Sequence, residues 1–171
     1  MGRTIATAAT AGRGRIFAMM DGDGDGTISA HDYLSRVDRA VQATGRSEDD
    51  PLVVAARAEA HTAWGAMDAN GDGKLTFEEY DAWVGADKFD NVCRFALGAL
   101  FDLADADGDG ALDKAEFTLL RTALNNAPGN AAAAFDALDG DGDGRVGRDD
   151  YLASIRAYVI GDASPMGEAL Y

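Results

Sequence analysis

A twelve-residue pattern occurs four times in this chain, each time with Asp at its first position, Gly at its sixth and an acid at its twelfth. The copies are DGDGDGTISAHD at residues 21–32, DANGDGKLTFEE at 68–79, DADGDGALDKAE at 105–116 and DGDGDGRVGRDD at 139–150. Repetition of this kind indicates one structural unit used several times, because such a unit buries its apolar face only against its neighbours.

Apolar residues keep the same register around every copy. An aromatic residue stands four positions before each first Asp, another follows each terminal acid, and the eighth position is aliphatic. The twelve residues are Phe17, Trp64, Phe101, Phe135, Tyr33, Tyr80, Phe117, Tyr151, Ile28, Leu75, Leu112 and Val146. A solvated acidic spacer has no reason to keep apolar residues in register, so we reject that interpretation.

The segments that flank the acidic copies are predicted to be helical. Pro51 and Pro128 are suited to the first turn of a helix, and LVVAARAEAHTAWGAM and AAAAFDAL follow them. Before the third copy, apolar residues from Val92 to Ala104 recur at spacings of three and four, which is typical of one helix face. Each repeat is therefore expected to be a helix, an acidic loop and a second helix.

The acidic loops carry the residue types that a calcium ion requires. Calcium takes six to eight oxygens at about 2.3–2.6 Å, and a loop of this pattern supplies side chains from positions 1, 3, 5 and 12 and a carbonyl from position 7. Glycine at position 6 permits the sharp turn. The candidate ligands are Asp21, Asp23, Asp25, the Thr27 carbonyl and Asp32; Asp68, Asn70, Asp72, the Lys74 carbonyl and Glu79; Asp105, Asp107, Asp109, the Ala111 carbonyl and Glu116; and Asp139, Asp141, Asp143, the Arg145 carbonyl and Asp150.

The four sites are not expected to be equal. The first and fourth loops end in Asp32 and Asp150, whose side chains are one methylene shorter than Glu79 and Glu116. A shorter carboxylate that gives one oxygen instead of two suits the six-coordinate magnesium ion. We therefore expect weaker or more magnesium-tolerant binding at the outer sites. Position 9 also differs, with Ser29, Asp113 and Gly147 in the first, third and fourth loops.

The even number of units predicts an all-α fold of four helix-loop-helix units in two pairs, packed as one compact globule. The aliphatic eighth positions are expected to pair two loops through a short two-stranded bridge, Ile28 with Leu75 and Leu112 with Val146. The N-terminal pair would occupy residues 1–88. The C-terminal pair, with a short tail, would occupy residues 89–171.

The net charge of −15 constrains the partners. Such an acidic chain repels phosphate backbones and anionic lipids and attracts cations, so nucleic acid and membrane partners are not expected. The sequence shows neither a membrane-spanning run nor a secretion signal, and one cysteine, Cys93, allows no internal disulfide. We expect a cytoplasmic monomer for which no protein partner is indicated.

The four loops and their flanks resemble the EF-hand superfamily, and more closely the group of calerythrin and the sarcoplasmic calcium-binding proteins. The second similarity rests on spacing, because the loops begin 47, 37 and 34 residues apart and residues 38–51 lengthen the first connection. The resemblance implies a compact globule that binds or buffers calcium. Members of this group commonly have one degenerate loop, and none is evident here. The twelve Arg against three Lys are compatible with a GC-rich bacterial genome.

Three functional classes remain to be compared. A calcium buffer is favoured, and the alternative is a calmodulin-like sensor that exposes an apolar, methionine-rich groove to a partner. An enzyme is not expected, because His31 and His61 are best explained as solvated or structural, and Cys93 as a buried thiol in an apolar stripe. The tail GDASPMGEALY, residues 161–171, is either disordered or folds back over an apolar surface.

Overall fold

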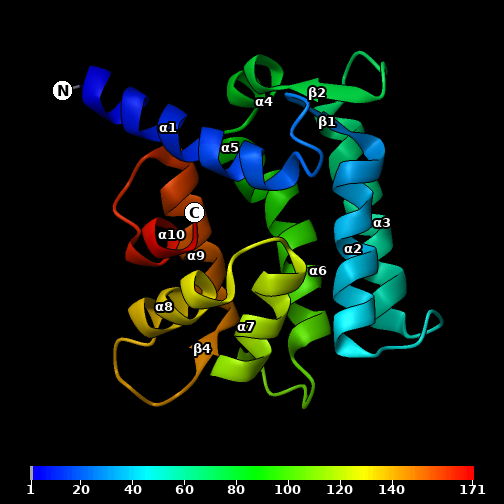
Figure 1. The fold of residues 1–171 in the computed structure, drawn as a ribbon, viewed down its shortest axis with the longest axis vertical. Helices are drawn as coiled ribbons and strands as arrows, with labels where there is room; N and C mark the ends of the chain where they lie inside the picture. Colours follow the sequence, from blue (N-terminus) through cyan, green and yellow to red (C-terminus); the bar gives the residue numbers. More distant parts are fainter. Residues whose placement is uncertain (1) are drawn as a thin grey trace.

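The protein is described by a computed structural model that covers residues 2–171, with only the helical backbone considered for residues 2–8 (Figure 1). Helices predominate, as predicted. In chain order the elements are α1 (Gly2–Met20), β1 (Thr27–Ser29), α2 (Ala30–Thr44), α3 (Pro51–Met67), β2 (Lys74–Thr76), α4 (Phe77–Trp83), α5 (Ala86–Lys88), the π-helical turn η1 (Phe89–Cys93), α6 (Arg94–Ala104), β3 (Ala111–Leu112), α7 (Lys114–Ala123), α8 (Pro128–Leu138), β4 (Val146–Gly147), α9 (Arg148–Ile160) and α10 (Pro165–Leu170).

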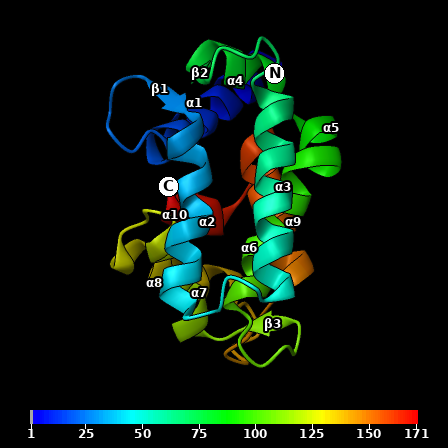
Figure 2. The same cartoon turned by 90° about the vertical axis from the view of Figure 1, so that its right-hand side faces the viewer.

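The two short ribbons pair the loops as the sequence predicted. Strand β1 runs antiparallel to β2 with Ile28 opposite Leu75, and β3 runs antiparallel to β4 with Leu112 opposite Val146. These four side chains are all at most 2% exposed. Figure 2 shows β1 and β2 at one end of the molecule and β3 at the other, so each pair of loops forms its own lobe.

The predicted helix starts are confirmed at both prolines. Helix α3 begins at Pro51, and the side chain of Asp50 caps it by accepting a hydrogen bond from the Leu52 N–H at 2.9 Å. Helix α8 begins at Pro128. Helix α2 ends at Thr44, and the φ of 68° at the following Gly45 lies in the left-handed region that a side chain would disfavour.

Aromatic residues pair across the two loops of each lobe. In the N-terminal lobe the ring centroids of Phe17 and Tyr80 lie 6.1 Å apart, and those of Tyr33 and Trp64 lie 5.8 Å apart. The C-terminal lobe repeats the arrangement, with 5.4 Å between Phe101 and Tyr151 and 5.6 Å between Phe117 and Phe135. The aromatic residue before one loop thus packs on the residue after its partner loop, which explains why the units occur in pairs.

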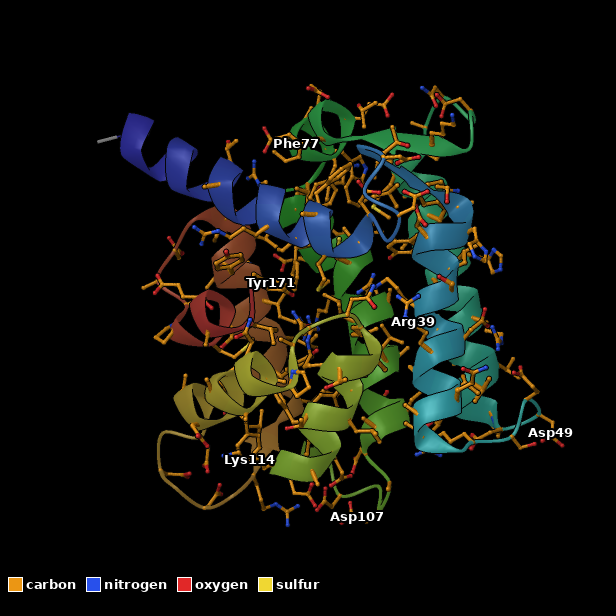
Figure 3. The ribbon with its side chains drawn as sticks, in the orientation of Figure 1. Arg39, Asp49, Phe77, Asp107, Lys114 and Tyr171 are labelled. Carbon is orange, nitrogen blue, oxygen red and sulfur yellow. The ribbon has the colours of Figure 1, made fainter. Side chains whose placement is uncertain are left out.

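The two lobes pack against each other. Figure 1 shows α6 running between α2 and α3 on one side and α9 on the other. Arginine side chains of the N-terminal lobe also donate hydrogen bonds to carbonyls of the C-terminal lobe: Arg39 Nε to Ala123 at 2.8 Å, and Arg46 Nε to Leu103 at 2.8 Å. Figure 3 shows Arg39 on the side of α2 that faces α7. The predicted compact globule is confirmed, and the expected lobe boundary at residues 88 and 89 falls between α5 and η1.

The C-terminal segment folds back over the core. Helix α10 packs on α8 and α9, and its Met166 and Leu170 are each 1% exposed. The ring of Tyr171 stacks on that of Tyr158, with 5.1 Å between the centroids. The tail is therefore ordered and folds back over an apolar surface, which is the second of the two predicted alternatives. Within the part of the chain that the structure describes, no helix combines the length and apolarity needed to cross a membrane.

Candidate metal centres

All four acidic loops have the same internal hydrogen bonds. The Oδ2 of the first Asp accepts from the N–H of the sixth-position glycine at 2.8–3.0 Å. The side-chain oxygen at position 3 accepts from the N–H at position 5 at 3.2–3.3 Å. The carboxylate at position 5 accepts from the N–H at position 7 at 2.9–3.0 Å. Each loop is therefore curled around its own side-chain oxygens.

The sixth-position glycines make this curl possible. Their φ angles are 88°, 78°, 83° and 79° at Gly26, Gly73, Gly110 and Gly144. This is the left-handed region, which L-residues with a side chain adopt only at a cost. The prediction that glycine serves the sharp turn is confirmed at all four positions.

In three of the four loops, the first aspartate presents an oxygen that the protein itself does not satisfy. Oδ1 of Asp21, Asp68 and Asp139 is buried and has no hydrogen-bond partner. The corresponding Oδ1 of Asp105 accepts only from the Asp109 N–H, at 3.3 Å. A buried carboxylate oxygen without a partner is costly, so these oxygens are placed for a cation that supplies the missing interaction.

Three of the loops also gather three carboxylates around one point. In each group, one oxygen from every member lies within 4.8 Å of those from the others. The groups are Asp21, Asp23 and Asp25; Asp105, Asp107 and Glu116; and Asp139, Asp141 and Asp143. Clustered hard oxygen donors without imidazole or thiolate groups suit calcium or magnesium better than a transition metal. The residues present therefore fit the metal that the loop pattern implies.

The second loop has an amide where the others have a carboxylate. Oδ1 of Asn70 accepts from the Asp72 N–H at 3.2 Å, while its Nδ2 donates to Glu79 Oε1 at 3.1 Å. The amide thus brings the carboxylate of position 12 toward position 3. The structure places Asp68, Asn70, Asp72 and Glu79 around one loop, as the sequence predicted.

Position 12 is held by a capping box in three loops but not in the fourth. The side chains at position 9, Ser29, Thr76 and Asp113, accept from the N–H of position 12 at 3.0, 3.2 and 2.8 Å. The carboxylates of Asp32, Glu79 and Glu116 in turn accept from the N–H of position 9 at 3.1, 2.9 and 3.2 Å. Gly147 offers no side chain, so α9 has no such cap and Asp150 is exposed.

These capping boxes were not predicted. The signal was present, because Ser, Thr or Asp followed three residues later by an acid, ahead of an amphipathic helix, is the sequence signature of a capped N-terminus. The acid at position 12 therefore has two roles. It caps the second helix of its unit, and it is the predicted ligand at the end of the loop.

Backbone hydrogen bonds, desolvation and neighbouring carboxylates shift two pKa values in the first loop. A backbone hydrogen bond from Thr27 holds the pKa of Asp25 below its usual value. The backbone hydrogen bond from Asp25 lowers the pKa of Asp23, but desolvation and the neighbouring Asp21, Asp25 and Asp32 outweigh it and raise that pKa overall. The negative charge is thus favoured on one carboxylate and disfavoured on its neighbour. A bound cation would stabilise the negative charge on both.

The fourth loop repeats this opposition of pKa values. The backbone N–H of Asp143 lowers the pKa of Asp141. The backbone N–H of Arg145 lowers the pKa of Asp143, but desolvation and the side chains of Asp139 and Asp141 raise it overall. The two DGDGDG loops therefore share an electrostatic pattern as well as a sequence.

The third loop is contacted by arginines from outside it. Arg145, at position 7 of the fourth loop, forms an ion pair with the Asp109 carboxylate at position 5 of the third. From the other lobe, Arg46 Nη2 donates to the carbonyl of Asp105 at 3.3 Å. Neither contact was predicted. The third site is thus linked to its partner loop and to the opposite lobe.

Sequence comparison accounts for all four loops. A model of an EF-hand domain pair matches residues 94–156, and a model of the EF hand matches residues 15–35 and 65–83. The fold and the loops define a helix-loop-helix cation-binding protein. The chain belongs to the EF-hand family and binds calcium through its EF hands. Coordination by each predicted ligand, including the carbonyls of Thr27, Lys74, Ala111 and Arg145, stays a prediction.

Solved structures agree with this assignment. A calcium-binding protein of Streptomyces coelicolor is 29% identical, with a TM-score of 0.75 over 91% of this chain and 99% of its own. This neighbour supports the resemblance to the calerythrin group that the loop spacing suggested. The photoprotein clytin matches 96% of this chain and 93% of its own with a TM-score of 0.78 but 16% identity, which shows a shared fold alone.

Two curated relatives match part of this chain. The probable calcium-binding protein CML16 of Oryza sativa subsp. japonica is 33% identical over 60% of this chain and 52% of its own length. A calcineurin subunit of Naegleria gruberi is 31% identical over 64% of this chain and 54% of its own. The chain therefore spans about half the length of these relatives.

Proposed function

We propose that this protein is an intracellular calcium buffer that acts as a monomer and binds up to four calcium ions. The observation that carries this proposal is the closed apolar interior. The aromatic residues that flank the loops pair inside each lobe. The two lobes pack on each other, and α10 packs on α8 and α9 of the C-terminal lobe. A buffer binds the ion without needing to uncover a groove for a partner.

The methionines support the same function. Met20 and Met67, directly before the first two loops, are each 6% exposed, and Met166 in α10 is 1% exposed. A sensor groove of the calmodulin type would present such flexible side chains to solvent once calcium is bound. Here these three methionines lie in the interior.

A calorimetric calcium titration of the metal-free protein, with and without about 1 mM magnesium, tests the proposal. Dissociation constants near 10⁻⁸ M with clear competition by magnesium are expected for a buffer. Values of about 10⁻⁷ to 10⁻⁵ M that magnesium hardly changes would contradict it and indicate a sensor.

Within this proposal the first and fourth sites are weaker or more tolerant of magnesium than the other two. The support is the short carboxylate of Asp32 and Asp150 at position 12, and at Asp150 also the missing capping box. Asp32→Glu and Asp150→Glu should each tighten calcium binding at their own loop and reduce magnesium competition there. Glu79→Asp is the matched control and should have the opposite effect. Unchanged affinities in all three variants would refute the inequality.

The alternative function is a calcium sensor, and two observations favour it. The Streptomyces coelicolor protein is described in connection with calcium-mediated regulation. In addition, Phe95 and Leu119 are 52% and 43% exposed on the C-terminal lobe. An apolar fluorescent dye separates the functions, because a sensor should bind it strongly only with calcium, whereas a buffer should bind little in that state.

We also propose that the protein has no catalytic activity. Cys93 lies half-buried in an apolar environment, and burial raises the pKa of its thiol to about 12, which leaves little nucleophilic thiolate at neutral pH. His31 and His61 are exposed on helix surfaces. Turnover that is lost in Cys93→Ala or in His→Gln variants would contradict this.

A further inference from the structure

Arg36 in α2 is a buried charge that the metal sites do not use. The residue is 7% exposed, and its guanidinium lies against the ring of Tyr33, with 5.3 Å from the guanidinium carbon to the ring centroid. Its Nη1 donates only to Met20 Sδ, at 3.6 Å, and its Nε has no hydrogen-bond partner. None of the ion pairs among the described residues includes it.

Apart from Arg36, the side chains that line the cavity beside it are uncharged. Two further cations lie nearby, because Arg39 repels Arg36 along α2 and Arg121 contacts the cavity-lining Met19 and Tyr171. Tyr33 lies on the same helix, Met20 closes the end of α1, Tyr80 belongs to α4 and Cys93 to η1. Burial raises the pKa of Cys93 to about 12 despite the opposing effect of Arg36, which indicates an environment that disfavours unpaired charge. A guanidinium in such a place is destabilising unless an anion accompanies it.

A cavity of about 50 Å³ lies beside this guanidinium, where both lobes contribute its walls. Met19, Met20 and Met67 line it from the N-terminal lobe, and Leu97 and Ile155 line it from the C-terminal lobe. Methionine side chains adapt readily to the shape of an apolar group. The cavity is thus lined by one cationic guanidinium and by apolar side chains that can adapt to the shape of a ligand.

We propose that this cavity binds a short-chain monocarboxylate, whose carboxylate pairs with Arg36 and whose alkyl group lies among the methionines. A planar guanidinium presents N–H groups in a geometry that matches a carboxylate, and Nε of Arg36 is available for such a contact. The cavity size limits the ligand. A cavity needs about 10–15 Å³ to hold one water molecule, so 50 Å³ accommodates roughly three to five groups of that size, as in acetate or propionate.

The test is a propionate titration of the full-length, calcium-saturated protein labelled with ¹³C at the methionine methyl groups. Saturable shifts are expected at Met20 and Met67, which line the cavity, and none at Met166, which does not. Chloride and the neutral propionamide are the control ligands at matched ionic strength. The absence of saturable shifts, or an equal response to propionamide, would overturn the proposal, because water alone would then account for the cavity.

A charge-removing variant separates Arg36 from the overall charge of the protein. Arg36→Met keeps a long apolar side chain, should fold at least as stably as the parent, and should bind propionate at least about tenfold more weakly. Arg39→Met is the matched control, since it removes the same charge one turn further along α2, where Arg39 Nε bonds the Ala123 carbonyl. Its propionate affinity should be unchanged.

A second variant keeps the proposal testable if Arg36→Met does not fold. Arg36→Lys retains the charge but loses the planar fork, so propionate affinity should fall while binding persists. Calcium affinity should be unaltered in both Arg36 variants, because Arg36 lies outside the loops. Equal propionate affinity in the parent and Arg36→Lys would refute the assignment.

Discussion

Arg121 donates from Nη2 to the phenolic oxygen of Tyr171 at 3.1 Å, and its guanidinium carbon lies 5.5 Å from the centroid of that ring. The arginine is fully buried in α7. Its other groups donate to Tyr151 Oη and Asn126 Oδ1, each at 2.9 Å. One buried cation thus links the third hand, the fourth hand and the C-terminal residue through neutral acceptors.

Replacing Tyr171 with Phe should destabilise the protein, because it leaves a buried guanidinium N–H with only the weak acceptor Met19 Sδ, at 3.7 Å. An unsatisfied buried donor costs about 1–3 kcal/mol, and we expect a loss of this size in the free energy of unfolding, measured with urea in saturating calcium. Tyr158→Phe is the matched control, since its hydroxyl accepts from the exposed Arg15 at 3.3 Å. Equal losses in the two variants would show that the Arg121 contact is not special.

Gly147→Ser should supply the capping box that the fourth hand lacks. The backbone of Gly147 is already extended, with φ of −73°, and a Cβ there would lie 3.9 Å from Asp150 Oδ2, an ordinary contact. We expect roughly 0.5–1 kcal/mol of added stability from the cap and the smaller unfolded-state entropy, together with tighter calcium binding at the fourth site. Ser29→Gly in the first hand should show the reverse. A Gly147→Ser protein less stable than the parent would contradict the capping argument.

Arg145→Gln should tighten calcium binding at the third hand. The arginine pairs with Asp109, so metal binding there has to compete with the guanidinium for a predicted ligand. Exposed ion pairs are worth about 0.2–1 kcal/mol, which sets the gain at no more than about fivefold in affinity. Lys114→Gln is the control, because Lys114 pairs with Asp136, which is not a predicted ligand. A weaker third site in Arg145→Gln would show that the pair organises the loop instead of blocking it.

Removing calcium should lower the melting temperature, and salt should partly restore it. Sixteen of the thirty acids stand at positions 1, 3, 5, 9 and 12 of the four loops, and four calcium ions would reduce the net charge from −15 to −7. In the metal-free protein the crowded carboxylates repel each other, and this repulsion weakens as ionic strength rises. Scanning calorimetry in chelator should therefore show a melting temperature that rises with KCl more steeply than that of the calcium-loaded protein. Identical melting temperatures with and without calcium would exclude this electrostatic account.

The parts of the fold that the sequence predicts are those that a local pattern specifies. Spacing alone placed the four loops, and the aliphatic eighth positions, such as Ile28 and Leu75, indicated which loops pair. The starts of α3 and α8 followed from Pro51 and Pro128, because proline favours the first helical turn. Each of these inferences required only residues within one repeat or one pair.

Contacts between segments that lie far apart in the sequence cannot be predicted from these local patterns. Arg36 and Arg121 are charged residues in amphipathic helices, and a charge there is ordinarily assigned to the solvated face. Their burial depends on where α1, α9 and the tail pack, and Tyr171 lies 50 residues from Arg121 in the chain. The order of the tail likewise does not follow from the sequence, because its few apolar residues indicate a buried face only once the surface beneath them is known.

The pKa of Cys93 is raised by burial from 9.0 to about 12, which makes the stability of the protein depend on pH in the alkaline range. An acid with a raised folded-state pKa stabilises the protein fully below its unfolded value, and this contribution is lost as pH rises from about 9 to 12. Alkylation by iodoacetamide, followed by mass spectrometry, should accelerate near pH 9 in urea but only near pH 12 in the folded protein. Cys93→Ala should also lose stability less steeply over this range than the parent. Alkylation of the folded protein with a midpoint near pH 9 would mean that the thiol reaches solvent readily, and it would remove the support that Cys93 gives to a dry environment around Arg36.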